Sequence, residues 1–319
     1  MKEDHEIDRF FDPAFNGEDL IKSAKRKSYF RITGVSLLVS ICVFALLVLL
    51  KIQLTPYLMN QKMTAKELYY EIYGANIYTG AWTERYKLVG SSAVAPKYKL
   101  LNGKPVNLGE VSFDTTDREI TIGNSEFAQF SYEGNRIMNF FHPSLQYPKY
   151  ADDLNELNKV NEGKWIEMAL SFDKAYTYDE VVSMLPEDVS LQWNWVNVYS
   201  AEELEAMQGS KGADPENPTV ILREYEVAGF PSVSKAGEEI KDPVDSFITT
   251  LELASRKGGS YKEDFEYMHH ALKEGHASLT EENVEIIGAV VVGDKQQLQS
   301  LIDKKYIKAS SFGAIVDQY

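Results

Sequence analysis

The feature that most constrains this chain is a run of 19 uncharged residues from Ile32 to Leu50, ITGVSLLVSICVFALLVLL. An α-helix rises about 1.5 Å per residue, so the run spans about 28 Å, close to the thickness of a bilayer's hydrocarbon core. Core helices of soluble proteins rarely stay uncharged over this length. Tyr29 and Phe30 before the run and Tyr57 after it are typical of interfacial aromatic residues. The run therefore predicts one transmembrane helix over residues 32–50.

A cleavable signal peptide is the main alternative to a permanent membrane helix. The charged region before the run is 31 residues long, and the run exceeds the apolar core of a typical signal peptide. The segment that follows, KIQLTPYLMN, contains no small-x-small cleavage pattern. These features favour an uncleaved signal-anchor that holds the protein in the bilayer as a single-pass chain.

Basic residues flank the apolar run unequally, and such residues collect on the cytoplasmic side of a membrane. The N-terminal flank is the richer one, with Lys22, Lys25, Arg26, Lys27 and Arg31 against Lys51, Lys62 and Lys66. We therefore expect a cytoplasmic tail over residues 1–31, the transmembrane helix, and an extracellular C-terminal region at the cell membrane.

The charge and the cysteine content exclude several functions and stabilising features for the external region. The tail is balanced in charge, so the net charge of −15 belongs to the residues after the membrane run. This acidic excess argues against direct binding of nucleic acid. The single cysteine, Cys42, lies inside the run, which excludes an intramolecular disulfide and a cysteine-based zinc site outside the membrane. An exported domain without disulfides favours a bacterial surface that lacks a disulfide-forming periplasm.

The cytoplasmic tail carries apolar and aromatic side chains in a segment too short to bury them. About thirty residues cannot build a hydrophobic core of their own. Exposed aromatic residues on such a tail either dock onto a partner protein or dip into the lipid interface, and composition leaves both open. Asn16 is the predicted N-cap of a helix that continues into the membrane run. The candidate partner-binding residues are Ile7, Phe10, Phe11, Phe15, Leu20 and Ile21.

The external region divides by pattern into two lobes, and residues 51–149 form the β-rich one. After a stalk with a predicted helix around residues 65–73, short β-type runs follow one another between turn residues. These runs are RYKLVGSSAV, KYKLLNG, REITIG and EFAQFSYEG. Asn102-Gly103 is typical of a tight hairpin turn.

Residues 150–319 carry the pattern of an α+β domain. After a predicted helix over residues 151–160, two strand–helix–strand units appear, separated by two further helices and a loop. In the first unit, Thr177 and Glu180 form a capping box; in the second, the run Ile286–Val292 is apolar on both faces, as in a central strand. Two βαβ units of this kind predict an α+β sandwich, with a ferredoxin-like arrangement as one candidate.

The motifs in the chain do not predict catalysis. Two S-x-x-K matches begin at Ser171 and Ser232, but the companion S-D-N and K-T-G motifs of penicillin-recognising enzymes are missing from the sequence. The spacing of His269, His270 and His276 does not fit a metal-binding helix. We therefore expect no enzyme activity, no metal and no cofactor. Trp193 and Trp195 lie two apart on one strand face, and are either core residues or an exposed binding strip.

Several long stretches resemble a known family. They are FNGEDLIKSAKRKSYFR with the membrane run, IMNFFHP, ALSFDKAYTYDEVVSMLPEDVSLQWNWVNVYS, and IIGAVVVGDKQQLQSLIDKKYIKASSFGAIVDQY. In order and extent these resemble the membrane-bound sigma factor regulators, or anti-sigma factors, of Gram-positive bacteria. The His-x3-Cys-x2-Cys zinc domain of other anti-sigma factors is missing from the sequence, so any sigma contact would fall to the short tail.

The resemblance implies a non-enzymatic regulator that holds an extracytoplasmic-function sigma factor through its tail and receives an envelope signal outside. The expected partners are that sigma factor, the lipid bilayer through residues 32–50 and, as a further option, another membrane protein, with no direct contact to nucleic acid. The alternative from another class is an extracellular binding module whose tail serves only as an anchor.

Overall fold

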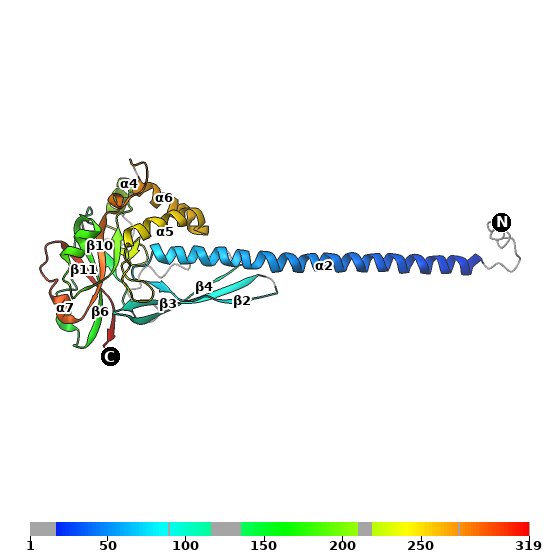
Figure 1. Ribbon diagram of the computed structural model, residues 1–319, viewed down its shortest axis with the longest axis horizontal. Helices are drawn as coiled ribbons and strands as arrows, with labels where there is room; N and C mark the ends of the chain where they lie inside the picture. Colours follow the sequence, from blue (N-terminus) through cyan, green and yellow to red (C-terminus); the bar gives the residue numbers. More distant parts are fainter. Residues whose placement is uncertain (1–16, 89, 116–134, 210–218, 274, 319) are drawn as a thin grey trace. The chain divides into compact units, whose positions relative to one another are not determined.

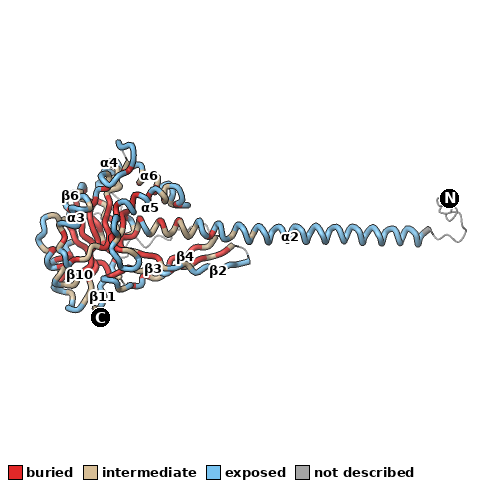
Figure 2. The backbone as a smooth tube through the Cα atoms, in the orientation of Figure 1, coloured by how far each residue is buried: buried red, intermediate tan, exposed pale blue. Residues whose placement is uncertain are grey.

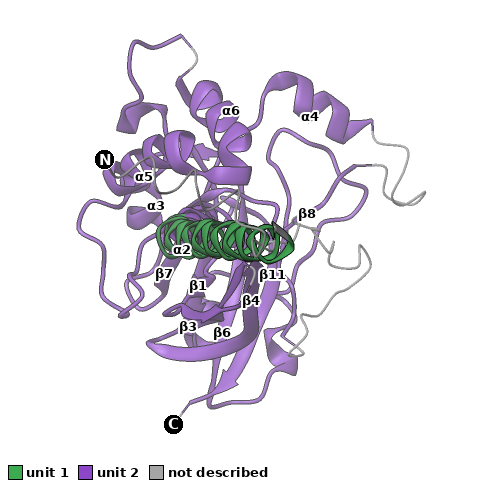
Figure 3. Ribbon diagram, turned by 90° about the vertical axis from the view of Figure 1, so that its right-hand side faces the viewer, with its two compact units in different colours: residues 1–57 green, residues 58–319 purple. Residues whose placement is uncertain are grey.

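The computed structural model describes residues 17–88, 90–115, 135–209, 219–273 and 275–318. The chain divides into two compact units, residues 1–57 and residues 58–319 (Figure 3). The predicted strand runs REITIG and EFAQFSYEG, Asn16, and almost all of the predicted loop at residues 209–219 lie outside the described residues. The division of the external region into lobes at residues 149 and 150 remains a prediction.

A single long helix, α2 (Gly17–Ile72), contains the predicted membrane run. Its most apolar 18-residue window has a mean hydropathy of 2.8 and is 0% buried, and within the described part of the chain it is the one helix long and apolar enough to cross a membrane. Glu18 and Asp19 occupy its first turn, as expected for residues that favour a helix N-terminus. The helix predicted around residues 65–73 is the last part of α2 and not a separate element.

The surroundings of α2 change along its length (Figure 2). Apolar side chains of the predicted membrane run are exposed, such as Leu38 at 63% and Phe44 at 69%. Within residues 58–72, by contrast, one stripe of the helix is buried in the second unit, with Met59, Ala65, Leu68 and Ile72 each 4% exposed or less. A long apolar stretch that protein does not cover is typical of a candidate membrane span.

The first sheet of the second unit is antiparallel and follows the predicted β-rich pattern. It comprises β1 (Tyr78–Thr79), β2 (Thr83–Tyr86), β3 (Ser91–Leu101) and β4 (Lys104–Asp114). Strand β3 pairs with all three others. Asn102 and Gly103 both have positive φ, at 50° and 77°, which is the conformation of a type I′ hairpin turn. The hairpin prediction is therefore confirmed.

The second sheet has five strands in the order β11-β6-β10-β7-β9, all antiparallel to their neighbours. They are β6 (Lys164–Tyr176), β7 (Ser190–Val196), β9 (Gly229–Pro231), β10 (Ile286–Gly293) and β11 (Ile307–Asp317). Strands β6, β10 and β11 are labelled in Figure 1. Strands β6 and β7 are joined through a helix and flank β10, while β10 and β11 are joined through a helix and flank β6. These are split βαβ connections, as in ferredoxin-like sheets. The α+β class and the central position of β10 are confirmed.

The remaining elements connect and cover this sheet. The helices are α3 (Tyr178–Met184), α4 (Ala201–Gln208), α5 (Pro243–Lys257), α6 (Lys262–Lys273) and α7 (Lys295–Gln299), with 3₁₀ turns η2 (Leu157–Lys159), η3 (Gly259–Tyr261) and η4 (Glu281–Asn283). Strands β5 (Asn139–Phe140) and β8 (Leu222–Arg223) form a two-stranded sheet. Thr177 and Glu180 make the predicted capping box of α3. The helix predicted over residues 151–160 is wrong, because that segment forms turns and η2.

Side chains of β6 alternate between two differently covered faces of the five-stranded sheet. Ile166, Met168, Leu170 and Phe172 join an apolar cluster with α3, α5, α6 and α7. Ala169 belongs to a cluster with Phe140 of β5 on the opposite side. That second side also receives the buried side chain of Glu167.

Candidate functional site

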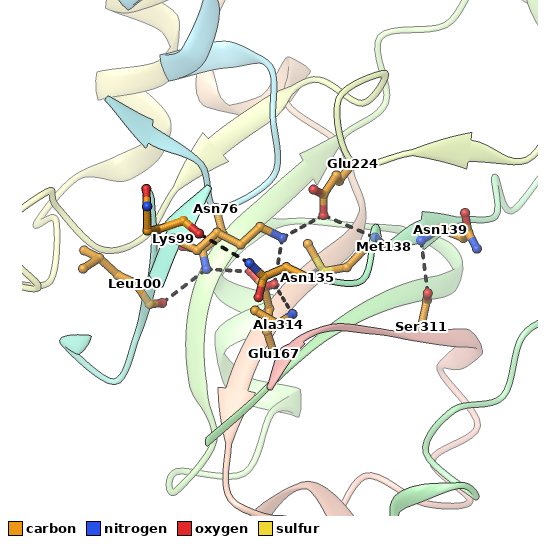
Figure 4. A network of polar contacts seen from close by, with 11 residues as sticks. Asn76, Lys99, Leu100, Asn135, Met138, Asn139, Glu167, Glu224, Ser311 and Ala314 are labelled. Atoms are coloured by element: carbon orange, nitrogen blue, oxygen red, sulfur yellow. Dashed lines mark hydrogen bonds and ion pairs between the residues drawn. The ribbon is translucent and has the colours of Figure 1, made fainter. Parts of the chain in front are cut away.

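A buried ion cluster lies where β3 meets the five-stranded sheet (Figure 4). It consists of Lys99 from β3, Glu167 from β6 and Glu224 from the segment after β8. The Lys99 ammonium lies 2.8 Å from a Glu167 carboxylate oxygen and 2.7 Å from one of Glu224. The three residues are 0%, 0% and 5% exposed. Two carboxylates thus share one ammonium in a site without water access.

Neutral donors add further hydrogen bonds to the two carboxylates (Figure 4). The backbone amide of Ala314 donates to Glu167 Oε2 at 2.9 Å, and that of Met138 donates to Glu224 Oε2 at 3.2 Å. Asn76 Nδ2 donates to Glu167 Oε1 at 2.8 Å and to the carbonyl of Leu100 at 3.2 Å. Asn76 has a φ of 57°, a left-handed conformation that asparagine tolerates better than most side chains.

The pKa values of Lys99 and Glu224 are both raised, for different reasons. Burial alone lowers the pKa of Lys99, but the carboxylates of Glu167 and Glu224 outweigh it and hold that pKa above its usual value. Burial raises the pKa of Glu224, and the charge of Glu167 raises it further against the opposing effect of Lys99. The folded state therefore retains the Lys99 proton and favours protonation of Glu224.

The ion cluster joins segments that are far apart in the chain. It connects β3 and residue 76 to strands β6 and β11 and to the turn after β8. Because its atoms are closed to solvent, the cluster has no access for a substrate. Its effect is to fix the chain around residue 76, directly after α2, against the five-stranded sheet.

A cavity of about 220 Å³ opens beside that segment, and we name it the α2–α5 cavity. The last turns of α2, residues 76–79, β9 and one side of α5 line it. Its lining includes the aromatic residues Tyr70, Tyr78, Trp193, Phe230 and Phe247, of which all but Tyr70 are at most 5% exposed. The rings of Phe230 and Phe247 lie 5.3 Å apart between centroids. An apolar interior of this kind is suited to a ring or a branched alkyl group.

Helix α5 presents a regular face to the cavity. Pro243 begins the helix, where a residue without an N–H is tolerated. Ser246, Phe247 and Thr250 line the cavity one helical turn further on, at the spacing that places side chains on one face. Leu251 and Ala254, each 0% exposed, point instead into the apolar cluster. The helix thus forms the cavity wall with one side and the core with another.

Charged side chains stand around the cavity. Glu67 and Glu71 come from α2, and Lys235 comes from the loop between β9 and α5. The Lys235 ammonium lies 3.9 Å from Glu71, and both side chains are nearly half exposed, at 45% and 43%. Glu67 accepts a hydrogen bond from Trp82 Nε1 at 3.0 Å. Burial raises the pKa of Glu71, Lys235 opposes that rise, and Glu67 adds to it.

The structure separates the residues that the sequence singled out. Leu20 and Ile21 lie on α2 and are exposed, at 50% and 56%. Ile7, Phe10, Phe11 and Phe15 lie outside the described residues. Their role in partner binding remains a prediction.

Trp193 and Trp195 are buried, at 2% and 0% exposure, and belong to one core cluster. Trp195 packs edge-on against Phe140, with 5.2 Å between ring centroids. Of the two sequence interpretations, the core fits these positions and the exposed binding strip does not. Trp193 is also one of the residues that line the α2–α5 cavity.

The serine and histidine candidates have structural contacts. Ser171 Oγ accepts a hydrogen bond from the Phe141 amide at 2.9 Å, and Ser232 Oγ accepts one from Asn194 Nδ2 at 2.8 Å. The rings of His269 and His270 lie edge to face, 6.1 Å apart. Across the described ranges, no group of three or more His, Cys, Asp or Glu side chains could hold a metal ion.

Comparison with known proteins gives one match. A family model described as sigma factor regulator C-terminal matches residues 157–314. The matched region runs from the start of η2 into β11, so it contains all of β6, β7, β9 and β10 and most of β11. No curated protein and no solved structure matches the chain.

Proposed function

We propose that this chain, whose residues 157–314 match the sigma factor regulator C-terminal family model, is a membrane-anchored anti-sigma factor of a Gram-positive bacterium. The family is a regulatory one, and its model match is the observation that carries the proposal. In this proposal the chain sequesters an extracytoplasmic-function sigma factor, acts without catalysis, and releases the sigma factor in response to an envelope signal.

The proposal assigns a task to each segment. Residues 1–31 form the cytoplasmic tail that binds the sigma factor, and residues 32–50 cross the cell membrane once. Residues 51–149 and 150–319 are two external lobes that receive the signal. The basic residues before the apolar run support this orientation, and the exposed apolar stretch of α2 supports the membrane span.

A direct test is to purify the chain and to identify any sigma factor that co-purifies with it. The tagged full-length protein, extracted in mild detergent, is expected to retain one sigma factor. Replacing Phe10, Phe11 and Phe15 together by alanine removes aromatic anchors of the kind that dominate interfaces, each contributing about 2 kcal/mol. The variant should lose the sigma factor and raise transcription from the cognate promoter at equal protein level.

Leu20→Ala with Ile21→Ala serves as a second variant, because these exposed residues lie closer to the membrane run. If neither variant changes sigma retention or transcription, the tail serves only as an anchor and the external binding module is the better function.

The orientation has its own test, because Cys42 is the one cysteine in the sequence. In a Cys42→Ala background, Glu187→Cys on the exposed surface of the second unit should react with a membrane-impermeant maleimide on intact cells. Ser23→Cys, at an exposed position near the start of α2, should react only after the cells are lysed. Reaction of Ser23→Cys on intact cells would reverse the proposed orientation.

A further inference from the structure

The α2–α5 cavity has the dimensions and the interior of a ligand site. A cavity of about 150 Å³ in an engineered protein core admits benzene, so about 220 Å³ accommodates one ring with a short substituent. Phe230 and Phe247 pack against each other and are only 1% and 2% exposed. The half-buried side chains of Tyr70, Ile77 and Ile240 therefore supply apolar surface that is open to a ligand. The interior therefore specifies a ring-sized apolar group.

The charged residues around the cavity indicate which charge a ligand with such an apolar group would carry. Glu67 and Glu71 are one turn apart on α2, a spacing at which two carboxylates repel each other and weaken a helix. Lys235 is the only basic residue among the residues that line the cavity. At 3.9 Å from Glu71 its ammonium is beyond hydrogen-bond length. The lining thus has one more carboxylate than ammonium.

The electrostatic state of Glu71 agrees with this count. Its pKa is raised because burial and then the neighbouring Glu67 disfavour its charged form, with Lys235 only partly compensating. A second cation near these two carboxylates would favour their charged forms and so offset both the burial of Glu71 and its repulsion by Glu67. An anion would add to the repulsion, and a neutral ligand would leave it unchanged.

We propose that the α2–α5 cavity binds a small organic amine, with its ring-sized apolar group against Tyr70, Ile77 and Ile240 and its ammonium group beside Glu67 and Glu71. Tyr70 lies in the same lining and offers an aromatic face to the cation. The site lies entirely within residues 58–319 and does not depend on sigma factor binding. It gives the external region a chemical specificity of its own.

The test compares two probes of nearly equal shape, benzylamine and benzyl alcohol, on the full-length protein in detergent micelles. Binding is measured by saturation-transfer NMR titration, with empty micelles as the background. We expect benzylamine to bind about fivefold more tightly, the upper end for a half-exposed ion pair. Glu71→Gln should remove that preference, whereas Glu252→Gln, the same charge change at an exposed position of α5, should keep it.

Blocking variants locate the binding. Thr250→Trp places a large ring in the cavity and should abolish binding of both probes, whereas Thr249→Trp, at the adjacent exposed position, should leave it intact. Ser246→Trp is a second block, at an exposed position of the cavity lining, in case Thr250→Trp does not fold.

The proposal is overturned by any of three outcomes: no saturable binding of either probe, equal affinity for both probes, or unchanged binding in the folded blocking variants. None of these outcomes affects sigma factor retention, so the failure of this inference and that of the proposed function are distinguishable.

Discussion

Both faces of the five-stranded sheet carry an apolar cluster, but the second face also carries the buried ion cluster, and this is the difference between them. One face packs against α3, α5, α6 and α7 through apolar residues, such as Leu251 and Phe265, that are 0% exposed. The other face includes Glu167 and meets Lys99 and Glu224 in a closed ion cluster. The first kind of burial is non-directional and tolerates changes of shape at a modest cost. The second depends on every partner, because a buried charge without its counter-ion is strongly unfavourable.

The largest expected effect comes from removing the ammonium of the ion cluster. Lys99→Met keeps the length of the side chain but leaves Glu167 and Glu224 buried together without a cation. We expect the free energy of unfolding to fall by about 3–5 kcal/mol. Urea unfolding followed by tryptophan fluorescence measures it, since all four tryptophans lie in residues 58–319.

A compensating variant sharpens this first prediction. Adding Glu167→Gln and Glu224→Gln removes the two charges but keeps oxygen acceptors for Ala314 and Met138. This triple variant should recover most of the loss, because uncharged buried groups no longer require a counter-ion. A Lys99→Met protein that loses less than about 1 kcal/mol would show that the two faces do not differ in this respect.

The apolar face should respond less, and in proportion to volume. Leu251→Ala removes a fully buried side chain of α5, and we expect it to cost about 3 kcal/mol through lost burial and a residual cavity. Leu251→Met, which nearly conserves volume, should cost less than about 1.5 kcal/mol. The same unfolding measurement applies. Equal losses for the two variants would mean that this face is as specific in shape as the ion cluster is in charge.

A smaller effect is expected where the backbone approaches the ion cluster. A side-chain carbon at Gly313 would meet the Glu167 carboxylate and the sulfur of Met138, and both neighbours are fully buried. Gly313→Ala should therefore cost about 2 kcal/mol by overpacking. Gly209→Ala is the matched control, because its new carbon would make only ordinary contact, 3.6 Å from the Glu205 carbonyl. Similar unfolding midpoints for the two variants would contradict this account.

The two faces also differ in how far the sequence predicts them. Period-two alternation identified β6 and β7, and a run that is apolar on both faces identified β10. Short-range sequence patterns identified the capping box at Thr177 and the Asn102-Gly103 turn. These features depend on neighbours within a few residues. The helix predicted over residues 151–160 failed because that segment bonds to β11, with the Asp153 amide donating to the Ser310 carbonyl.

The ion cluster and the cavity could not be derived from the sequence, since their members come together only in the fold. Lys99 and Glu224 are 125 residues apart. The one local signal is Glu167, a charged residue inside the otherwise apolar strand run WIEMALSF. Such a residue on a central strand requires a buried partner, but the chain offers too many lysines to identify Lys99.

The smallest effect on the free energy of unfolding is expected at alkaline pH, in a pH range set by the pKa of Lys99. Its pKa in the folded protein lies above the unfolded value of 10.5, so between these two values the folded state binds more protons. The cluster's contribution is complete below pH 10.5 and is lost as the pH rises through the folded pKa. Stability should therefore fall by at most about 1.4 kcal/mol per pH unit from this group.

The triple variant separates this contribution from that of buried tyrosines. Burial raises the pKa of Tyr73 to about 12, so ionisation of this tyrosine also lowers the free energy of unfolding at high pH. That decrease should be the same in the wild type and in the triple variant. Above pH 10.5 the free energy of unfolding of the wild type should fall more steeply with pH than that of the triple variant, and the difference in slope should correspond to about one proton. Parallel slopes would mean that Lys99 releases its proton without loss of stability, and the charged face would then be as insensitive to pH as the apolar one.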